Sequence, residues 1–163
     1  WEDSLFQPVF EGSFLNLEEG KVFDLGGVHL SMIYTPGHTQ GMMVPLVEED
    51  RAAIFGDACG VFTFLFRPEC STVDVYRKTL LKLKSYEDRY DRILRQHGTC
   101  ESPKSLVDEN LEVAEEILNG TDDHIPFDYL GYHAFIAKKT DPKTGIRADG
   151  KSGNIVYAQD HIR

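Results

Sequence analysis

The sequence has few cysteines, a deficit of positive charge and no long hydrophobic run. Its three cysteines, Cys59, Cys70 and Cys100, include no C-x-x-C pair, and their odd number argues against a disulfide framework. Acidic residues outnumber basic residues by 27 to 17, so the net charge of −10 disfavours binding to the phosphate backbone of nucleic acids. No stretch of about 18 apolar residues occurs, so we expect no membrane partner. These absences together predict a soluble protein of a reducing compartment, the cytoplasm.

The chain has 163 residues, which is enough for one domain with a hydrophobic core. Residues 1–20 are rich in phenylalanine and leucine but follow no helical or strand period. We interpret them as an N-terminal arm, or as the remnant of a missing half, and residues 21–163 as the main portion of a domain. An apolar arm of this kind could pair with a second copy of the chain, which would make a homodimer.

Alternating apolar residues predict a meander of consecutive strands from residue 21 onward. The predicted strands cover residues 21–25, 28–34, 42–47 and 51–55. Gly26-Gly27 is expected to form a hairpin turn between the first two. The first half of the chain is therefore predicted to be a sheet.

Two amphipathic helices are predicted in the second half. Ser71 or Thr72 can cap the first, which is expected to reach about Arg89. Ser102-Pro103 has the pattern of a helix start, and Asn119-Gly120 has the pattern of its end.

The remaining segments complete an α/β pattern. A short strand over residues 92–96 is predicted between the helices, and a final strand pair over 133–137 and 154–159. Residues 121–130 are expected to be a loop, and the Gly- and Lys-rich connection 138–153 to be mobile.

Three polar side chains follow predicted strands at the point where each strand gives way to a loop. His38 follows a strand and a Pro-Gly turn, Asp57 follows a strand and a glycine, and His97 ends a strand. In layered α/β folds such strand ends gather at one edge of the sheet. Imidazole and carboxylate are ligands that zinc or iron takes in hydrolytic sites. The pattern indicates a metal site, although each residue alone would be an ordinary loop histidine or turn aspartate.

Several neighbouring residues have two interpretations. Thr39 could support a metal ligand or cap its loop. Cys59 could contact the site or be a small buried apolar residue. Phe62 and the residues 64–66 could line a substrate pocket or belong to the core.

Three strings in the chain together resemble the second half of the metallo-β-lactamase superfamily. They are T-P-G-H-T-Q-G at 35–41, I-F-G-D-A at 54–58 and Q-H-G-T at 96–99. The resemblance covers roughly residues 20–120 and implies an αββα sandwich, represented here mainly by its C-terminal βα half. It implies that His38 binds a first metal, Asp57 bridges two metals and His97 binds the second. The implied cofactor is Zn²⁺, two per intact site, with iron or manganese as alternatives.

The sequence departs from that family in one large respect. The family's H-x-H-x-D-H signature should precede the P-G-H-T loop, but no two of the six histidines are separated by a single residue, and only His29 precedes His38. Each metal would lack two protein ligands, whereas a catalytic zinc site has about three. We therefore expect this chain alone to bind metal weakly or not at all, and to be an inactive fragment of a longer enzyme.

The resemblance also implies a reaction for the intact enzyme. A hydroxide held between two metals would attack an acyl or phosphoryl centre, with Asp57 as the catalytic bridge. An aspartate rather than a cysteine at this position is similar to thioesterases and lactonases. His97 follows Asp57 by 40 positions, too few for the extra domain of nucleic-acid-processing relatives. We predict hydrolysis of a small-molecule thioester, lactone or other acyl substrate. The alternatives are a truncated non-catalytic module, a phosphodiesterase-type enzyme and a di-iron relative.

Overall fold

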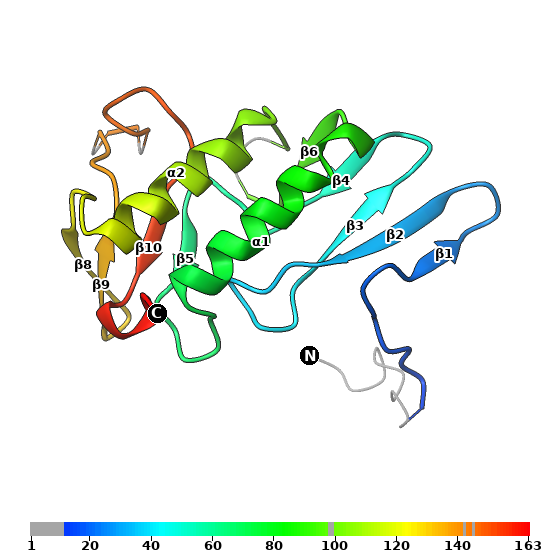
Figure 1. Cartoon of the computed structure of the whole chain (residues 1–163), viewed down its shortest axis with the longest axis horizontal. Helices are drawn as coiled ribbons and strands as arrows, with labels where there is room; N and C mark the ends of the chain where they lie inside the picture. Colours follow the sequence, from blue (N-terminus) through cyan, green and yellow to red (C-terminus); the bar gives the residue numbers. More distant parts are fainter. Residues whose placement is uncertain (1–11, 98–99, 142, 145) are drawn as a thin grey trace, which may run out of the picture.

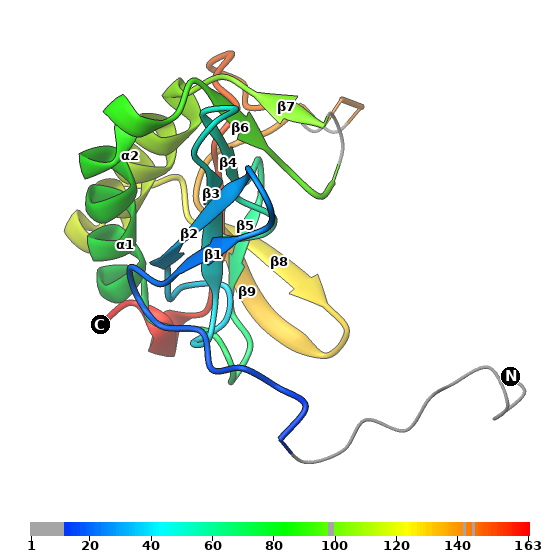
Figure 2. The same cartoon turned by 90° about the vertical axis from the view of Figure 1, so that its right-hand side faces the viewer.

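Both α-helices of the described residues lie on the same side of the β-strands. The computed structural model describes residues 12–97, 100–141, 143–144 and 146–163. Helix α1 (Val73–Ser85) packs beside helix α2 (Ser105–Asn119) (Figure 1). In the turned view the helices form one layer and the strands another (Figure 2). The predicted α/β class is confirmed, with the arrangement of a βα layer pair.

The larger sheet begins with the predicted meander. Its first four strands pair antiparallel in chain order, and the next strand along the sheet then runs parallel to the fourth. Within the described residues the sheet has six strands in the order β1-β2-β3-β4-β6-β7. They are β1 (Val22–Asp24), β2 (His29–Tyr34), β3 (Met43–Val47), β4 (Ala52–Ile54), β6 (Arg92–Leu94) and β7 (Glu101–Ser102).

Local sequence sets the start of this sheet. Gly26 and Gly27 have φ angles of 83° and 103°, a backbone region that L side chains rarely adopt. The side chain of Asp24 accepts a hydrogen bond from the Gly26 amide at 2.8 Å, which closes the turn. The Gly26-Gly27 hairpin and the strands on either side of it are confirmed.

The second sheet is formed by strands that lie far apart in the sequence. Its order is β5-β10-β9-β8, four strands within the described residues. Strand β10 runs parallel to β5 and antiparallel to β9, and the predicted final strand pair is confirmed by the pairing of Val156 with Ile136. The strands are β5 (Thr63–Leu65), β8 (Ile125–Tyr129), β9 (Tyr132–Ile136) and β10 (Ile155–Tyr157).

The predicted loop over 121–130 is wrong in its second half. Residues 125–129 form β8, which pairs with β9 through a two-residue turn at Leu130-Gly131. Both turn residues have positive φ, at 49° and 84°, as a tight hairpin with the twist of its strands requires. Pro126 is tolerated because β8 is an edge strand, where a missing amide donor breaks no central ladder.

The start of α1 and the end of α2 agree with the prediction, whereas the end of α1 does not. The Thr72 hydroxyl accepts a hydrogen bond from the Val75 amide at 3.4 Å, as the capping pattern predicts, but α1 ends at Ser85 and a 3-10 turn, η2, covers Glu87–Arg89. Gly120 ends α2 with φ 68°, so that predicted end is confirmed.

The predicted start of α2 at Ser102-Pro103 is wrong. Ser102 belongs to β7, where it lies opposite Ile93 of β6. The helix begins at Ser105, two residues later than predicted, after Lys104, whose side chain makes no capping hydrogen bond. Strand pairing with β6 therefore overrides the local capping pattern.

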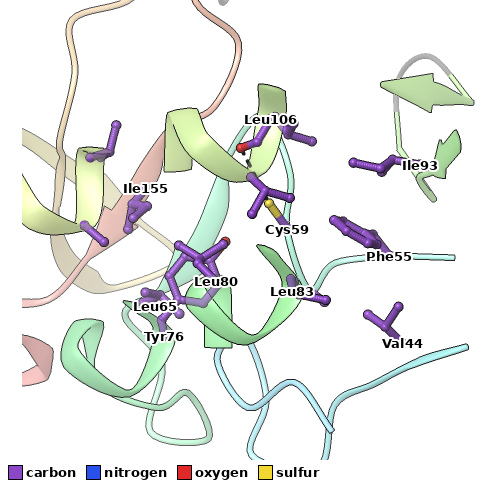
Figure 3. Close-up of a cluster of buried hydrophobic side chains, with 14 of the residues drawn as sticks. Val44, Phe55, Cys59, Leu65, Tyr76, Leu80, Leu83, Ile93, Leu106 and Ile155 are labelled. Carbon is purple, nitrogen blue, oxygen red and sulfur yellow. Dashed lines mark hydrogen bonds between the residues drawn. The ribbon is translucent and has the colours of Figure 1, made fainter. Parts of the chain in front are cut away.

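The main core lies between the sheets and the two helices. The α1 residues Val73, Tyr76, Leu80 and Leu83 are fully buried at helical spacing, as expected for the predicted amphipathic helix. They belong to one cluster with Phe55, the residue that follows β4, and Figure 3 shows several of these side chains together. Burial of each large apolar side chain contributes about 1.5–3 kcal/mol. This packing holds the strands in place, and the loops that follow these strands carry His38, Asp57 and His97.

The predicted N-terminal arm falls only in part within the described structure. Residues 1–11, with Phe6, Val9 and Phe10, lie outside the described residues. In the described part, Phe14 and Leu15 are 74% and 73% exposed. The homodimer expected through this arm stays a prediction. Among the described residues, no helix combines the length and the apolar character that crossing a membrane requires.

Candidate active site

A cavity of about 830 Å³ opens at the loops that follow the strands. His38, Asp57 and His97 all contribute to its lining, although they lie far apart in the sequence. The structure therefore brings the three predicted ligand residues to one cavity, and the following contacts explain how each is held there.

The loop that carries His38 is fixed against α1. The Pro36 carbonyl accepts a hydrogen bond from the Thr79 hydroxyl at 2.6 Å, and the Gly37 carbonyl accepts one from the Ser71 amide at 2.8 Å. A Cβ atom on Gly37 would lie 2.6 Å from the ring of Tyr76, so this position accepts only glycine without movement. Gly37 is therefore required because the loop approaches α1 closely at this position.

His38 is oriented by a backbone carbonyl. Its Nδ1 atom lies 3.0 Å from the carbonyl oxygen of Phe64, the residue at the middle of β5. A carbonyl can only accept, so Nδ1 carries a proton, and in the neutral ring Nε2 then keeps its lone pair. This is the arrangement by which proteins orient a metal-binding imidazole.

Asp57 and His97 are brought together by strand register. Ile54 at the end of β4 pairs in parallel with Leu94 at the end of β6, and Asp57 and His97 are each the third residue beyond that pair. The Asp57 Oδ1 atom lies 3.4 Å from His97 Nε2. The two side chains are 34% and 76% exposed, so both reach the solvent of the cavity.

Gly56 makes the turn that presents Asp57. Its φ of 53° lies in the left-handed region, and the Ala58 amide donates to the Phe55 carbonyl at 2.9 Å directly around it. The Asp57 side chain therefore lines the cavity, whereas the next residue, Ala58, is buried in the core.

His38, Asp57 and His97 are of the residue types that bind a metal ion, but they do not form a complete set of ligands. Two imidazoles and a carboxylate are ligands for a divalent metal ion, and His38 has its second nitrogen held as such a ligand requires. Yet the described part of the chain contains no group of three or more His, Cys, Asp or Glu side chains close enough to hold a metal ion. His38 lines the same cavity as Asp57 and His97, but it does not lie close enough to them to complete a group of three ligands. The three residues therefore share one cavity, but the described residues do not complete a metal site.

Thr39 and Cys59 lie outside the cavity lining among the described residues. The Thr39 carbonyl accepts from the amides of Gly37 and Met42, which closes the loop around His38. Cys59 is fully buried, with Sγ 3.8 Å from the Leu106 carbonyl (Figure 3). Burial raises the pKa of its thiol to about 12, so Cys59 is a protonated core residue.

The phenylalanine-rich segment after Asp57 divides between cavity and core. Phe62 and Phe64 line the cavity, as a pocket function predicts. Leu65 and Phe66 are buried, at 0% and 2% exposure. Both interpretations of this segment are therefore partly right. Leu65 faces the main core, opposite to Phe64, as alternate strand residues do, whereas Phe66 is buried in a second apolar cluster against which Phe62 and Phe64 pack.

Asn110 of α2 supports two loops of the cavity from below. Its Nδ2 atom donates to the Gly60 carbonyl at 3.0 Å, and Gly60 lines the cavity. A Cβ atom on Gly153 would lie 2.6 Å from the same Nδ2, so the second loop also rests directly on this buried amide. Asn110 is fully buried, and no pattern in the sequence indicated this role.

The connection over 138–153, predicted to be mobile, is anchored through its described residues. Arg147 is only 3% exposed and donates to the Gly153 carbonyl at 2.7 Å and to Asp149 Oδ1 at 3.0 Å. The Glu109 side chain accepts from the amides of Ser152 and Gly153 at 2.7 and 2.8 Å. These contacts hold one wall of the cavity, to which Ile146, Gly150 and Ser152 contribute.

Two arginines in the cavity lining were not predicted. Arg67 follows β5, and Arg95 follows β6. Arg95 is the first residue after β6, and Arg67 is the second residue after β5. Both lie just beyond a strand end, as Asp57 and His97 do, which is a positional signal in the sequence. Applied to every charged residue near a strand end, that signal would have found them.

A comparison with known protein families found no family model that matches the chain. Among curated proteins, a metallo-beta-lactamase fold-containing protein of Sulfurisphaera tokodaii is 29% identical over 110 residues. The match covers 66% of this chain and 41% of the relative, so the chain spans about two fifths of the length of the curated relative that it matches.

Solved structures show the same fold. An archaeal metallo-beta-lactamase superfamily protein from Sulfolobus tokodaii matches 77% of this chain and 46% of its own, at 20% identity and a TM-score of 0.52. A stereoselective inverting sec-alkylsulfatase from a Pseudomonas species matches 66% of this chain and 19% of its own, at 14% identity and a TM-score of 0.55. A metallo-beta-lactamase family protein from Thermus thermophilus matches 65% and 36%, at 19% identity and a TM-score of 0.51. The strand-end residues at one cavity and these likenesses together identify the chain as having the metallo-β-lactamase fold.

Proposed function

We propose that the protein to which this sequence belongs is a metal-dependent hydrolase of a small-molecule acyl substrate, such as a thioester or a lactone. The observation that carries the proposal is that three separate strand ends deliver His38, Asp57 and His97 to one cavity. Its volume of about 830 Å³ lies in the range of small-molecule sites.

His38, Asp57 and His97 are the residues of this chain that would hold the metal, with Zn²⁺ as the first candidate and iron or manganese as alternatives. When bound, the metal would supply Lewis-acid activation of the substrate carbonyl and a water nucleophile at neutral pH. Because the described residues do not form a complete cluster, further ligands are proposed to come from outside the described residues.

The residues of this chain then have separate tasks. The Phe64 carbonyl keeps His38 in the tautomer that leaves Nε2 open toward a ligand. Asp57 supplies the negative charge that compensates a bound cation, and it lies against His97 on the neighbouring strand end. The apolar side chains Phe62 and Phe64 limit the access of bulk water to one side of the cavity.

Removal of Asp57 tests this assignment in the complete protein. We expect Asp57→Asn to lower kcat/KM for thioester or lactone hydrolysis by about 100-fold or more, since loss even of groups that only support metal ligands costs 10–100-fold. The matched control is Asp91→Asn, which removes a surface carboxylate paired with Arg51. Normal activity in the Asp57 variant would contradict the proposal.

A non-catalytic module is the second candidate, and the incomplete ligand cluster favours it. The two candidates differ in the complete protein, because an enzyme must hold its metal stoichiometrically and turn over substrate. A complete protein that binds no metal, and hydrolyses none of a panel of thioesters and lactones, would favour the module.

A further inference from the structure

We propose that the cavity takes an amphiphilic organic anion, whose charged group binds Arg67 and whose apolar body lies against Phe62 and Phe64. The inference rests on the proposed function only in treating this cavity as the substrate site. It names the substrate class: an acyl compound that carries a carboxylate or a similar anionic group beside an alkyl or aryl portion.

The cavity lining has more basic than acidic side chains, whereas the chain as a whole is acidic. The whole sequence has a net charge of −10, yet the cavity lining contains Arg67 and Arg95 against one carboxylate, Asp57. A bound metal would neutralise Asp57 further. The lining is therefore more basic than the chain as a whole, even with Glu69 at ion-pair distance from Arg67, and a concave surface strengthens the attraction of such charges for an anion.

Arg67 has hydrogen-bonding capacity that its described neighbours do not use. Its Nη1 atom lies 3.7 Å from Glu69 Oε1, which is too long for a hydrogen bond. Its Nε–H is buried and has no hydrogen-bond partner among the described residues. The buried Nε–H is closed to a molecule in the cavity, but the Arg67 side chain is 37% exposed, and the two Nη atoms of a guanidinium can donate parallel hydrogen bonds to one carboxylate. The geometry therefore favours a planar anion over a neutral group.

The apolar side of the cavity belongs to a larger aromatic cluster. The Phe64 ring lies 5.1 Å from the Phe66 ring and 6.2 Å from the Tyr129 ring, measured between centroids. The Phe66 ring also lies 5.7 Å from Tyr132. Rings supported in this way by β5, β8 and β9 present a firm apolar surface, which suits an alkyl chain or an aryl ring.

Phe64 joins the apolar surface to the reacting end of the cavity. Its carbonyl orients His38, while its side chain lines the cavity. A substrate whose apolar portion contacts this ring must therefore place its neighbouring atoms beside a proposed metal ligand. Arg67 is two residues beyond the end of β5, so the same short segment supplies the contacts for charge and for apolar body.

The test uses three simple probes on the complete protein: octanoate, octanamide and acetate. Binding is measured by titration calorimetry, on the protein as purified and again after chelation, so that a metal cannot account for carboxylate binding. We expect octanoate to bind at least tenfold more tightly than either octanamide, which lacks the charge, or acetate, which lacks the chain. Equal binding of octanoate and octanamide by the chelated protein would overturn the inference without the use of any variant.

Two arginine variants test whether Arg67 is the residue that binds the carboxylate of octanoate. Arg67→Gln should weaken octanoate binding about 10- to 100-fold, which is the range for a charge-assisted hydrogen bond. Arg77→Gln is the matched control, because Arg77 pairs with Glu115 between the helices and lies outside the cavity lining. An equal loss in both variants, or none in Arg67→Gln, would overturn the role of Arg67.

The outcome is distinguishable from that of the proposed function. If octanoate binds through Arg67 but no acyl compound is hydrolysed, the anion site stands and the hydrolase assignment fails. If neutral thioesters are hydrolysed as fast as carboxylate-bearing ones and octanoate does not bind, the hydrolase assignment stands and the anion site fails.

Discussion

The two sheets contribute different chemistry to the same cavity. The six-stranded sheet supplies His38, Asp57 and His97 from the loops after β2, β4 and β6. The four-stranded sheet supplies aromatic residues of β5, backed by the hairpin of β8 and β9. Ligand placement depends on backbone register in the first sheet, whereas the apolar surface depends on side-chain packing in the second. Changes to the first should therefore abolish chemistry, and changes to the second should alter substrate preference.

A paired kinetic experiment tests that division. We expect His38→Ala to lower kcat about 100-fold or more, because it removes a proposed ligand. Phe62→Ala should instead raise KM about tenfold for a substrate with an alkyl or aryl portion, with a smaller change in kcat, because it removes contact area but no ligand. Steady-state kinetics of the complete protein separate the two effects. A Phe62→Ala variant with a loss of kcat as large as that of His38→Ala would break the comparison.

A smaller effect is expected on stability, at a glycine of the His38 loop. Gly37→Ala places a Cβ atom 2.6 Å from the Tyr76 ring and should reduce the free energy of unfolding by about 1–3 kcal/mol. Gly41→Ala is the control, since a Cβ atom there meets nothing within 4 Å, and its effect should stay within about 0.5 kcal/mol. Denaturant unfolding measures both. Equal stability of the two variants would mean that the loop does not rest on α1 as described.

The sequence was most informative where local pattern and register agree. The positions of Asp57 and His97 could be predicted together, because each follows a short strand and the two strands pair in parallel. The hairpin at Gly26-Gly27 and the Gly120 helix end are also local, since positive φ angles explain both.

The remaining features depend on contacts between distant segments. Residues 125–129 contain Pro126 and follow a polar stretch, so only the pairing with β9 reveals a strand. The 138–153 connection is rich in flexible residues, and its anchoring requires the buried Arg147 and the carboxylate of Glu109 on α2. Arg67 was missed because its significance lies in the cavity it lines rather than in any motif around it.

His38, Asp57 and His97 are proposed to be ligands of one metal centre. The most direct measurement is the bound metal per chain, by inductively coupled plasma mass spectrometry, in the complete protein and in its His38→Ala and His97→Ala variants. We expect two metal ions in the complete protein, and less bound metal in each variant while folding, checked by circular dichroism, is unchanged. Full metal content in both variants would contradict it, because the metal would then be held without the residues that these three strand ends bring together.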